Sequence, residues 1–158
     1  MKILDLINLG SNFLKENKIP SHILDSEILL SKTLKKTREE ILINFDKKID
    51  KKNIEKFKKY IDRRSNHEPI AYIFGKKEFF GKNFLVKNTL IPRPETELLI
   101  EKLIKIFNKR KISILDIGTG SGCIIITLLN NLRKSNGIGI DISKNAILTA
   151  EKNVVKYK

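Results

Sequence analysis

Residues 112–122 read Ile-Ser-Ile-Leu-Asp-Ile-Gly-Thr-Gly-Ser-Gly, and this stretch decides the fold class of the second half of the chain. Its apolar beginning predicts a short buried strand, its glycines predict a tight loop, and residues 123–132 predict a helix. Residues 138–140 predict a second strand that ends at Asp141, and Ser143 can cap a further helix. Because strands and helices alternate, the order predicts an α/β fold with a right-handed crossover and a parallel sheet.

The glycine loop is a candidate ligand site. Its glycines follow the carboxyl end of the first strand, where a ligand must approach the backbone, a Cβ would collide, and helix amides are expected to point outward. The glycines predicted to allow this close approach are Gly118, Gly120 and Gly122. A tight turn that serves no ligand is the simpler alternative for the glycines.

Rossmann dinucleotide sites and methyltransferase sites share this geometry, so details decide between them. Cys123 stands where the dinucleotide fingerprint has glycine or alanine, and the Asp116 carboxylate, at the strand end, would repel a pyrophosphate. The loop also lacks the Gly-Lys-Ser/Thr ending of a P-loop. S-adenosylmethionine carries an ammonium and a sulfonium group and no phosphate, so a carboxylate beside the loop favours it. The sequence therefore predicts S-adenosylmethionine as the cofactor.

A second acid supports a nucleoside ligand. Asp141 follows the second strand, 19 residues after Gly122. At that distance an acidic side chain can accept hydrogen bonds from both ribose hydroxyls. The alternatives are that Asp141 caps the helix ahead of Ser143 and that Asp116 accepts hydrogen bonds from loop amides. Loop and acid together indicate a nucleoside-bearing cofactor, but they name no methyl acceptor.

The front of the chain predicts a small helical bundle over residues 2–65, because apolar residues recur there at spacings of three and four. The apolar residues of the second helix that are expected in the core are Ile23, Leu24, Ile28 and Leu29. A third helix is expected to begin at a capping box formed by Thr37 and Glu40.

Prolines and glycines punctuate residues 69–92 and predict a connector with a β-hairpin. A helix is then expected from about Glu95 to Phe107, with a buried stripe of Leu98, Leu99, Leu103, Ile104 and Phe107. The predicted domains are a helical domain over 1–68, the connector over 69–92, and the first part of a Rossmann-like methyltransferase domain over 93–158.

The composition narrows the class of protein. Hydrophobic residues make up 41% and charged residues 32%, which is typical of a globular chain. No run of 18 apolar residues or signal peptide is present, so we expect a cytoplasmic protein. One cysteine, Cys123, and two histidines, His22 and His67, predict neither a disulfide nor a metal site.

The net charge of +14 makes nucleic acid a partner to consider. The densest basic run comprises Lys47, Lys48, Lys51, Lys52, Lys56, Lys58 and Lys59. A solvated helix face is its simpler interpretation, and a surface for RNA or the ribosome is the alternative.

Three stretches, Ile91-Pro92-Arg93-Pro94-Glu95-Thr96-Glu97, residues 115–123 and Asp141-Ile142-Ser143, resemble the release factor glutamine methyltransferase family (HemK, PrmC). Residues 68–75 resemble the connector of the same family. The resemblance implies methylation of the glutamine amide in the Gly-Gly-Gln loop of peptide chain release factors, with the helical domain helping to hold that protein substrate.

The resemblance also assigns residues. In the family the glycine loop and the acid after the second strand bind the cofactor, which implies that role for residues 118–122 and Asp141. The segment Arg93, Pro94, Glu95 and Thr96 is expected to border the active site, and opening the following helix is an equally good interpretation of it.

One departure concerns catalysis. The family places an Asn-Pro-Pro-Tyr motif after its fourth strand, and that motif does not occur in these 158 residues. We therefore expect the chain to be a truncated or split form that is inactive alone. Two other functions stay open: an adenine-specific DNA methyltransferase, which shares that type of motif, and a non-catalytic module that binds RNA or the ribosome. The front domain and residues 93–97 favour the protein methyltransferase.

Overall fold

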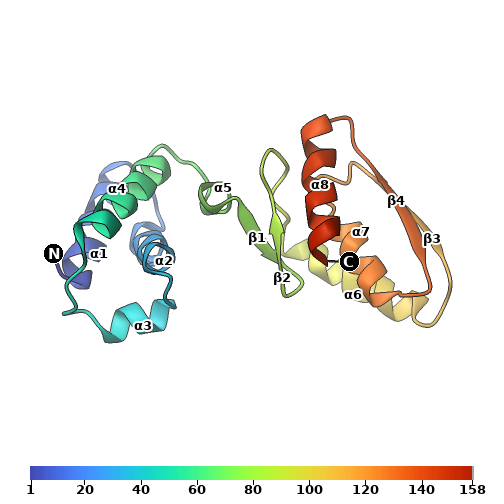
Figure 1. Ribbon diagram of the computed structural model, residues 1–158, viewed down its shortest axis with the longest axis horizontal. Helices are drawn as coiled ribbons and strands as arrows, with labels where there is room; N and C mark the ends of the chain where they lie inside the picture. Colours follow the sequence, from blue (N-terminus) through green and yellow to red (C-terminus); the bar gives the residue numbers. More distant parts are fainter. Residues whose placement is uncertain (158) are drawn as a thin grey trace. The chain divides into compact units, whose positions relative to one another are not determined.

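The computed structural model describes residues 1–157, which fall into two compact units, Met1–Ile73 and the residues from Phe74 onward. The first unit is helical (Figure 1). Its elements are α1 (Ile3–Glu16), α2 (His22–Leu34), α3 (Arg38–Ile43), α4 (Lys51–Ser65) and α5 (Ile70–Phe74). Helices α1, α2 and α4 pack side by side and confirm the predicted bundle.

The core of the helical unit lies between these three helices. Its fully buried apolar side chains include Ile3, Leu6, Leu14, Leu29, Leu30 and Phe57. Gly10 of α1 allows the close approach of both neighbours, because a Cβ there would lie 2.6 Å from the Ser26 Oγ and 2.7 Å from the Phe57 ring. The Ser26 hydroxyl donates to the Ile7 carbonyl at 2.8 Å, which joins α2 to α1.

The predicted core stripe of α2 is partly wrong. Ile23 and Leu24 are exposed, whereas Asp25 and Ser26 are buried. The physical reason is a buried polar contact, in which the Asp25 carboxylate accepts from the Arg64 Nε at 2.7 Å. Because α4 supplies a charged partner, α2 turns a carboxylate inward and rotates its first apolar residues toward solvent.

The predicted capping box of α3 is confirmed. The Glu40 amide donates to the Thr37 hydroxyl at 3.1 Å, and the Thr37 amide donates to the Glu40 carboxylate at 2.7 Å. The basic run around α4 lies on the exposed side of that helix, while Phe57 and Ile61 face the core.

The second unit contains the expected hairpin and strand–helix repeats. Its elements are β1 (Lys76–Phe79), β2 (Lys82–Leu85), α6 (Glu95–Phe107), β3 (Ser113–Ile117), α7 (Cys123–Asn131), β4 (Asn136–Ile140) and α8 (Lys144–Tyr157). Strands β1 and β2 are antiparallel, and β3 and β4 are parallel, as predicted. The Ser143 hydroxyl accepts from the Ala146 amide at 3.3 Å and caps α8, also as predicted.

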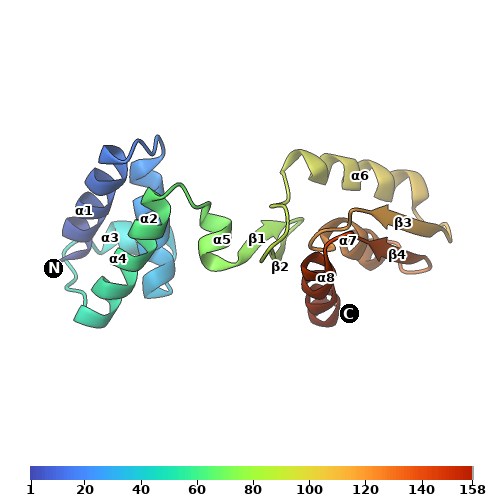
Figure 2. The same ribbon diagram turned by 90° about the horizontal axis from the view of Figure 1, so that it is seen from above.

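Helix α7 covers only one face of the β3–β4 pair (Figure 2). On the other face the side chains of Leu115, Ile117, Ile138 and Ile140 are 60%, 75%, 67% and 45% exposed. The register places Leu115 opposite Ile138 and Ile117 opposite Ile140. Two cross-strand apolar pairs therefore face solvent in this chain.

The predicted stripe of α6 needs the same kind of correction. Leu98 and Leu99 are exposed, and the residue of α6 that is fully buried is Ile100. Leu103, Ile104 and Phe107 are half-buried against the core around α7. Helix α6 thus has two apolar sides, and residues 1–157 cover one of them. The spacing of apolar residues alone does not show which side of α6 is buried.

Candidate cofactor site

The predicted site residues of the glycine loop and the two acids meet at one edge of the parallel strand pair. The loop connects β3 to α7, and Asp141 follows β4 directly. Because Ile117 pairs with Ile140, the carboxyl ends of both strands lie side by side. The structure therefore brings together Asp116, residues 118–122 and Asp141.

Asp116 lies on the face of β3 that α7 covers and is half-buried. One of its carboxylate oxygens accepts from the Thr119 hydroxyl at 2.7 Å. Thr119 is buried, and its position depends on Gly139 in β4, since a Cβ at residue 139 would lie 2.8 Å from the Thr119 Oγ1. The alternative role considered for Asp116, bonding to loop amides, falls to Asp141 instead.

Asp141 braces the loop. Its Oδ2 accepts from the Gly120 amide at 2.9 Å, and its Oδ1 accepts from the Ser143 amide at 2.9 Å. The Ser143 amide and, after it, the Gly120 amide hold the pKa of this carboxyl below its ordinary value. A carboxylate has about four lone-pair positions, so about two of them stay open for further donors.

The glycines of the loop differ in what surrounds them. Gly118 has a φ of +75°, and a Cβ added there would meet no atom within 4 Å. Gly122 has a φ of +76°, but a Cβ there would lie 2.9 Å from the Ile126 Cδ1. Gly122 is therefore needed for packing, whereas the space beside Gly118 is open to a ligand.

Four amides of the loop itself are used within the protein. The Gly118 and Thr119 amides both donate to the Ile140 carbonyl, at 2.8 and 2.9 Å. The Gly122 amide donates to the Thr119 carbonyl at 2.8 Å, and the Gly120 amide is taken by Asp141. These four donors are satisfied within the protein, so the loop is a poor receptor for phosphate and better suited to a cationic ligand that needs carboxylates.

The segment Arg93–Thr96 opens α6. The Arg93 carbonyl accepts from the Thr96 amide at 3.1 Å, and the Pro94 carbonyl accepts from the Glu97 amide at 2.9 Å. Arg93, Pro94 and Glu95 are exposed, and Thr96 is half-buried. Within residues 1–157 no hydrogen bond or ion pair joins this segment to the glycine loop, so its place beside the active site stays a prediction.

Sequence reasoning missed Asn153, which is fully buried in α8. Its Nδ2 donates to the Ser121 carbonyl at 2.8 Å and to the Leu85 carbonyl at 3.0 Å, and its Oδ1 accepts from the Leu85 amide at 2.9 Å. One side chain thus ties the glycine loop to β2. The available signal was its position on the same helix face as Ala146 and Ala150, where a polar residue needs partners.

Other chemistry is sparse in the described part of the chain. Burial raises the pKa of the Cys123 thiol, which makes a reactive thiolate unfavourable. Residues 1–157 contain no group of three metal-ligating side chains. Over the same residues, no helix has the length and apolar character needed to cross a bilayer.

Comparisons with known proteins identify related families. The family described as PrmC N-terminal domain matches residues 5–75, and the family described as ribosomal protein L11 methyltransferase (PrmA) matches residues 93–158. A release factor glutamine methyltransferase of Buchnera aphidicola is 47% identical over 84% of this chain and 48% of its own length. Proteins of the same name from Leptospira interrogans and Clostridium botulinum are 40% and 41% identical over 98% and 99% of this chain, and over 55% and 56% of their own lengths.

The second unit is therefore the first part of a class I methyltransferase fold. More narrowly, the chain is related to the release factor glutamine methyltransferases and corresponds to their amino-terminal portion. It spans about half the length of these curated relatives. The resemblance seen in the sequence is confirmed.

Proposed function

We propose that this chain supplies the cofactor-binding part of an enzyme that methylates the glutamine amide in the Gly-Gly-Gln loop of peptide chain release factors. The observation that carries the proposal is the pair of carboxylates, Asp116 and Asp141, which flank the open side of the glycine loop at Gly118. The names of the relatives point to the methyl acceptor.

The residues at the strand ends fit S-adenosylmethionine, which would supply an electrophilic methyl group on a sulfonium centre. The Asp116 oxygen that does not accept from Thr119 would pair with the ammonium group. The open lone pairs of Asp141 would accept from ribose hydroxyls, and the space beside Gly118 would admit the ligand to the backbone. The roles of Thr119, Gly120, Ser121 and Gly122 are to shape and hold this loop.

We further propose that the helical unit contacts the release factor and that Arg93, Pro94, Glu95 and Thr96 border the substrate. The exposure of Arg93, Pro94 and Glu95 at the start of α6 supports this assignment, since nothing within residues 1–157 occupies their outer side.

Residues 1–158 are expected not to transfer methyl groups by themselves. An amide nitrogen is a poor nucleophile because its lone pair is delocalised, so it must be held in line with the methyl group. The resemblance assigns that task to an Asn-Pro-Pro-Tyr motif, which these residues do not contain. Cofactor binding should also be weak, because the strand pair has an uncovered apolar face.

The test is calorimetry and methyl transfer on a fusion of residues 1–158 to the remaining carboxy-terminal part of the Buchnera relative. We expect S-adenosylmethionine to bind the fusion and labelled methyl to reach a release factor. Asp141→Ala should weaken binding at least about tenfold, which is about 1.4 kcal/mol. Glu101→Ala, an acid-to-alanine change at an exposed position of α6, is the matched control and should leave binding unchanged.

The same assay decides between the acceptors. Transfer to a release factor but not to duplex DNA supports the proposal, and the reverse supports the adenine-specific DNA methyltransferase. Failure of the fusion to bind S-adenosylmethionine, or binding that survives Asp141→Ala, would overturn the cofactor assignment. Robust transfer by residues 1–158 alone would contradict the expected need for the missing motif.

A further inference from the structure

The fold gathers positive charge at the edge of the β3–β4 pair opposite the glycine loop. Two turns lie at this edge, residues 108–112 before β3 and residues 132–135 before β4. The Ser135 hydroxyl accepts from the Ile112 amide at 3.3 Å, and the Asn136 amide donates to the Ile112 carbonyl at 3.1 Å. These bonds hold the two turns against each other, although 20 or more residues separate them in sequence.

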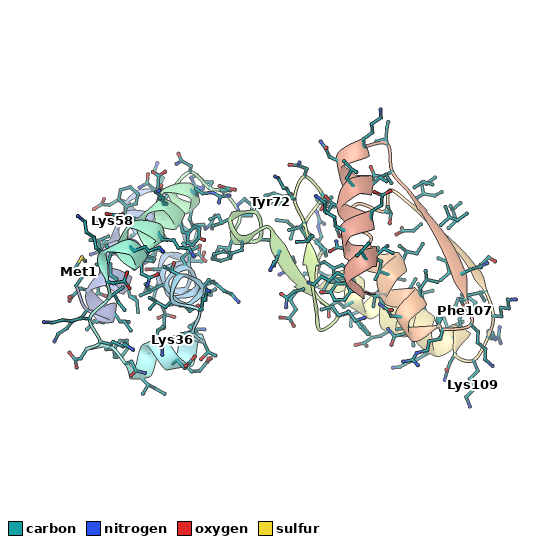
Figure 3. All side chains as sticks on the ribbon, in the orientation of Figure 1. Met1, Lys36, Lys58, Tyr72, Phe107 and Lys109 are labelled. Atoms are coloured by element: carbon teal, nitrogen blue, oxygen red, sulfur yellow. The ribbon has the colours of Figure 1, made fainter. Side chains whose placement is uncertain are left out.

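We call the cations of these turns the amino-end cation cluster: Lys109, Arg110, Lys111, Arg133 and Lys134. All five side chains are exposed, and none forms an ion pair within residues 1–157. Figure 3 labels Lys109 in the turn that follows Phe107 at the end of α6. Between residues 102 and 140 the sequence contains one acid, Asp116, and it lies at the far end of β3.

The basic run around α4 differs from the amino-end cation cluster in having acids close by in the sequence. Acids stand among its lysines in the sequence, at Asp46, Asp50, Glu55 and Asp62, although Asp46 pairs with Lys2 and not with a lysine of the run. The net charge of that stretch is therefore lower than its number of lysines. The amino-end cation cluster has no such compensation, so its like charges repel one another on a rigid edge and favour a polyanionic partner.

We propose that the amino-end cation cluster binds the phosphate backbone of a base-paired nucleic acid. Adjacent strands hold their turns about 5 Å apart, so the cations are closely spaced and can contact successive phosphates. Neither turn contains an aromatic residue that could stack on an unpaired base, which favours a duplex over a single strand. The nucleic acid is a binding partner and not the methyl acceptor.

This surface is separate from the candidate cofactor site. Strand β3 has five residues, about 16 Å of extended chain, between Lys111 and the glycine loop. A duplex on the cluster would therefore leave Asp116 and Asp141 accessible. The inference does not depend on the proposed methyl transfer, and its test needs neither cofactor nor release factor.

The test measures binding of residues 1–158 to a short fluorescent RNA duplex and to a DNA duplex of the same sequence over a range of salt concentrations. The cluster variant is Lys109→Gln, Arg110→Gln, Lys111→Gln, Arg133→Gln and Lys134→Gln. The control removes five charges from the helical unit: Lys47→Gln, Lys48→Gln, Lys51→Gln, Lys52→Gln and Lys56→Gln. Both variants have the same net charge, so general attraction is matched.

We expect the cluster variant to lose at least about tenfold in affinity and to lower the slope of log K against log salt by about 4.5, at about 0.9 per phosphate contact on a duplex. The control should keep most of the affinity and slope. Binding of either duplex that depends on the amino-end cation cluster supports the proposal. Comparing the two duplexes shows whether RNA or DNA is preferred.

Two results would overturn it: equal losses in both variants, or no measurable duplex binding by the unchanged chain. In the second case, cluster-dependent binding to phosphatidylserine vesicles would identify a membrane surface as the partner instead. All ten substituted side chains are exposed, so folding should be unaffected. Circular dichroism checks that both variants fold. The double variant Arg133→Gln with Lys134→Gln tests the proposal a second time and should lower the slope of log K against log salt by about 2.

Discussion

Asn153 connects three segments of the second unit through one amide group. Its partners, Leu85 and Ser121, lie 68 and 32 residues away in sequence. Spacing and motif reasoning selected Asp116, the glycines and Asp141 as candidates because the pattern that indicates them lies within a short stretch of sequence. It missed Asn153, because the position of this residue on the buried face of α8 shows that it needs hydrogen-bond partners but not which segments supply them. The hydrogen bond between Asp141 and the Gly120 amide could not be predicted either, because it forms only when the fold brings the two residues together.

Asn153→Ala should destabilise the second unit by about 3 kcal/mol, because backbone groups of Leu85 and Ser121 would be left buried without partners. Denaturant unfolding of residues 1–158 measures the loss, and hydrogen exchange at the Leu85 amide should rise with it. Lys152→Ala, at an exposed neighbour on α8, is the control and should have little effect. Unchanged exchange at Leu85 would contradict the bridging role.

The Asp141–Gly120 contact should respond to acid. The folded pKa of Asp141 lies below its unfolded value, which is about 3.9. The stabilisation from this carboxylate is therefore complete above about pH 4 and is lost as the pH falls through the lower folded pKa. In an NMR titration, the Gly120 amide shift should follow that protonation. Asp141→Asn should abolish the titration, and an unaltered Gly120 curve in that variant would exclude the contact.

Helix ends and helix faces differed in how well they could be predicted. The caps at Thr37 and Ser143 depend on residues three positions apart, and both were correct. The buried faces of α2 and α6 depend on what packs there. Arg64 draws Asp25 inward on α2, and the spacing of apolar residues on α6 fits more than one face.

Gly10→Ala tests how closely α1 approaches its neighbours. A methyl group there would come within 2.8 Å of Ser26, Phe57 and Ile61, so α2 and α4 must move apart. We expect a net loss of about 1–2 kcal/mol, since overpacking outweighs the better helix propensity of alanine. Thermal unfolding measures it. Asn12→Ala, on the exposed side of α1, should have no effect or stabilise slightly, and equal behaviour of the two variants would refute the steric explanation.

At the scale of the whole molecule, the parallel strand pair has an unusual surface. Its face opposite α7 presents Leu115, Ile117, Ile138 and Ile140 to solvent. Parallel strands are ordinarily covered on both faces. The relatives are about twice as long as this chain, and the sequence correctly predicted a parallel sheet without showing which face these residues would leave open.

Self-association of residues 1–158 should depend on that face. Replacing Leu115 by Lys and Ile138 by Glu keeps a favourable cross-strand pair, because the two residues lie opposite each other. We expect the double variant to be more soluble and to sediment as a smaller species, with little change in the unfolding of either unit. Ile43→Lys, at an exposed position of the helical unit, is the control. Identical sedimentation of both variants would show that the sheet face is not the association surface.

Gly139 leaves no room for a side chain, and this limits which substitutions the site tolerates. A change as small as glycine to alanine would push against Thr119, and through it against the hydroxyl that holds Asp116. The altered residue would lie near the carboxyl end of β4, and from the sequence alone the change would be classed as conservative. If the proposed cofactor assignment holds, we expect Gly139→Ala to weaken cofactor binding through Thr119 and Asp116.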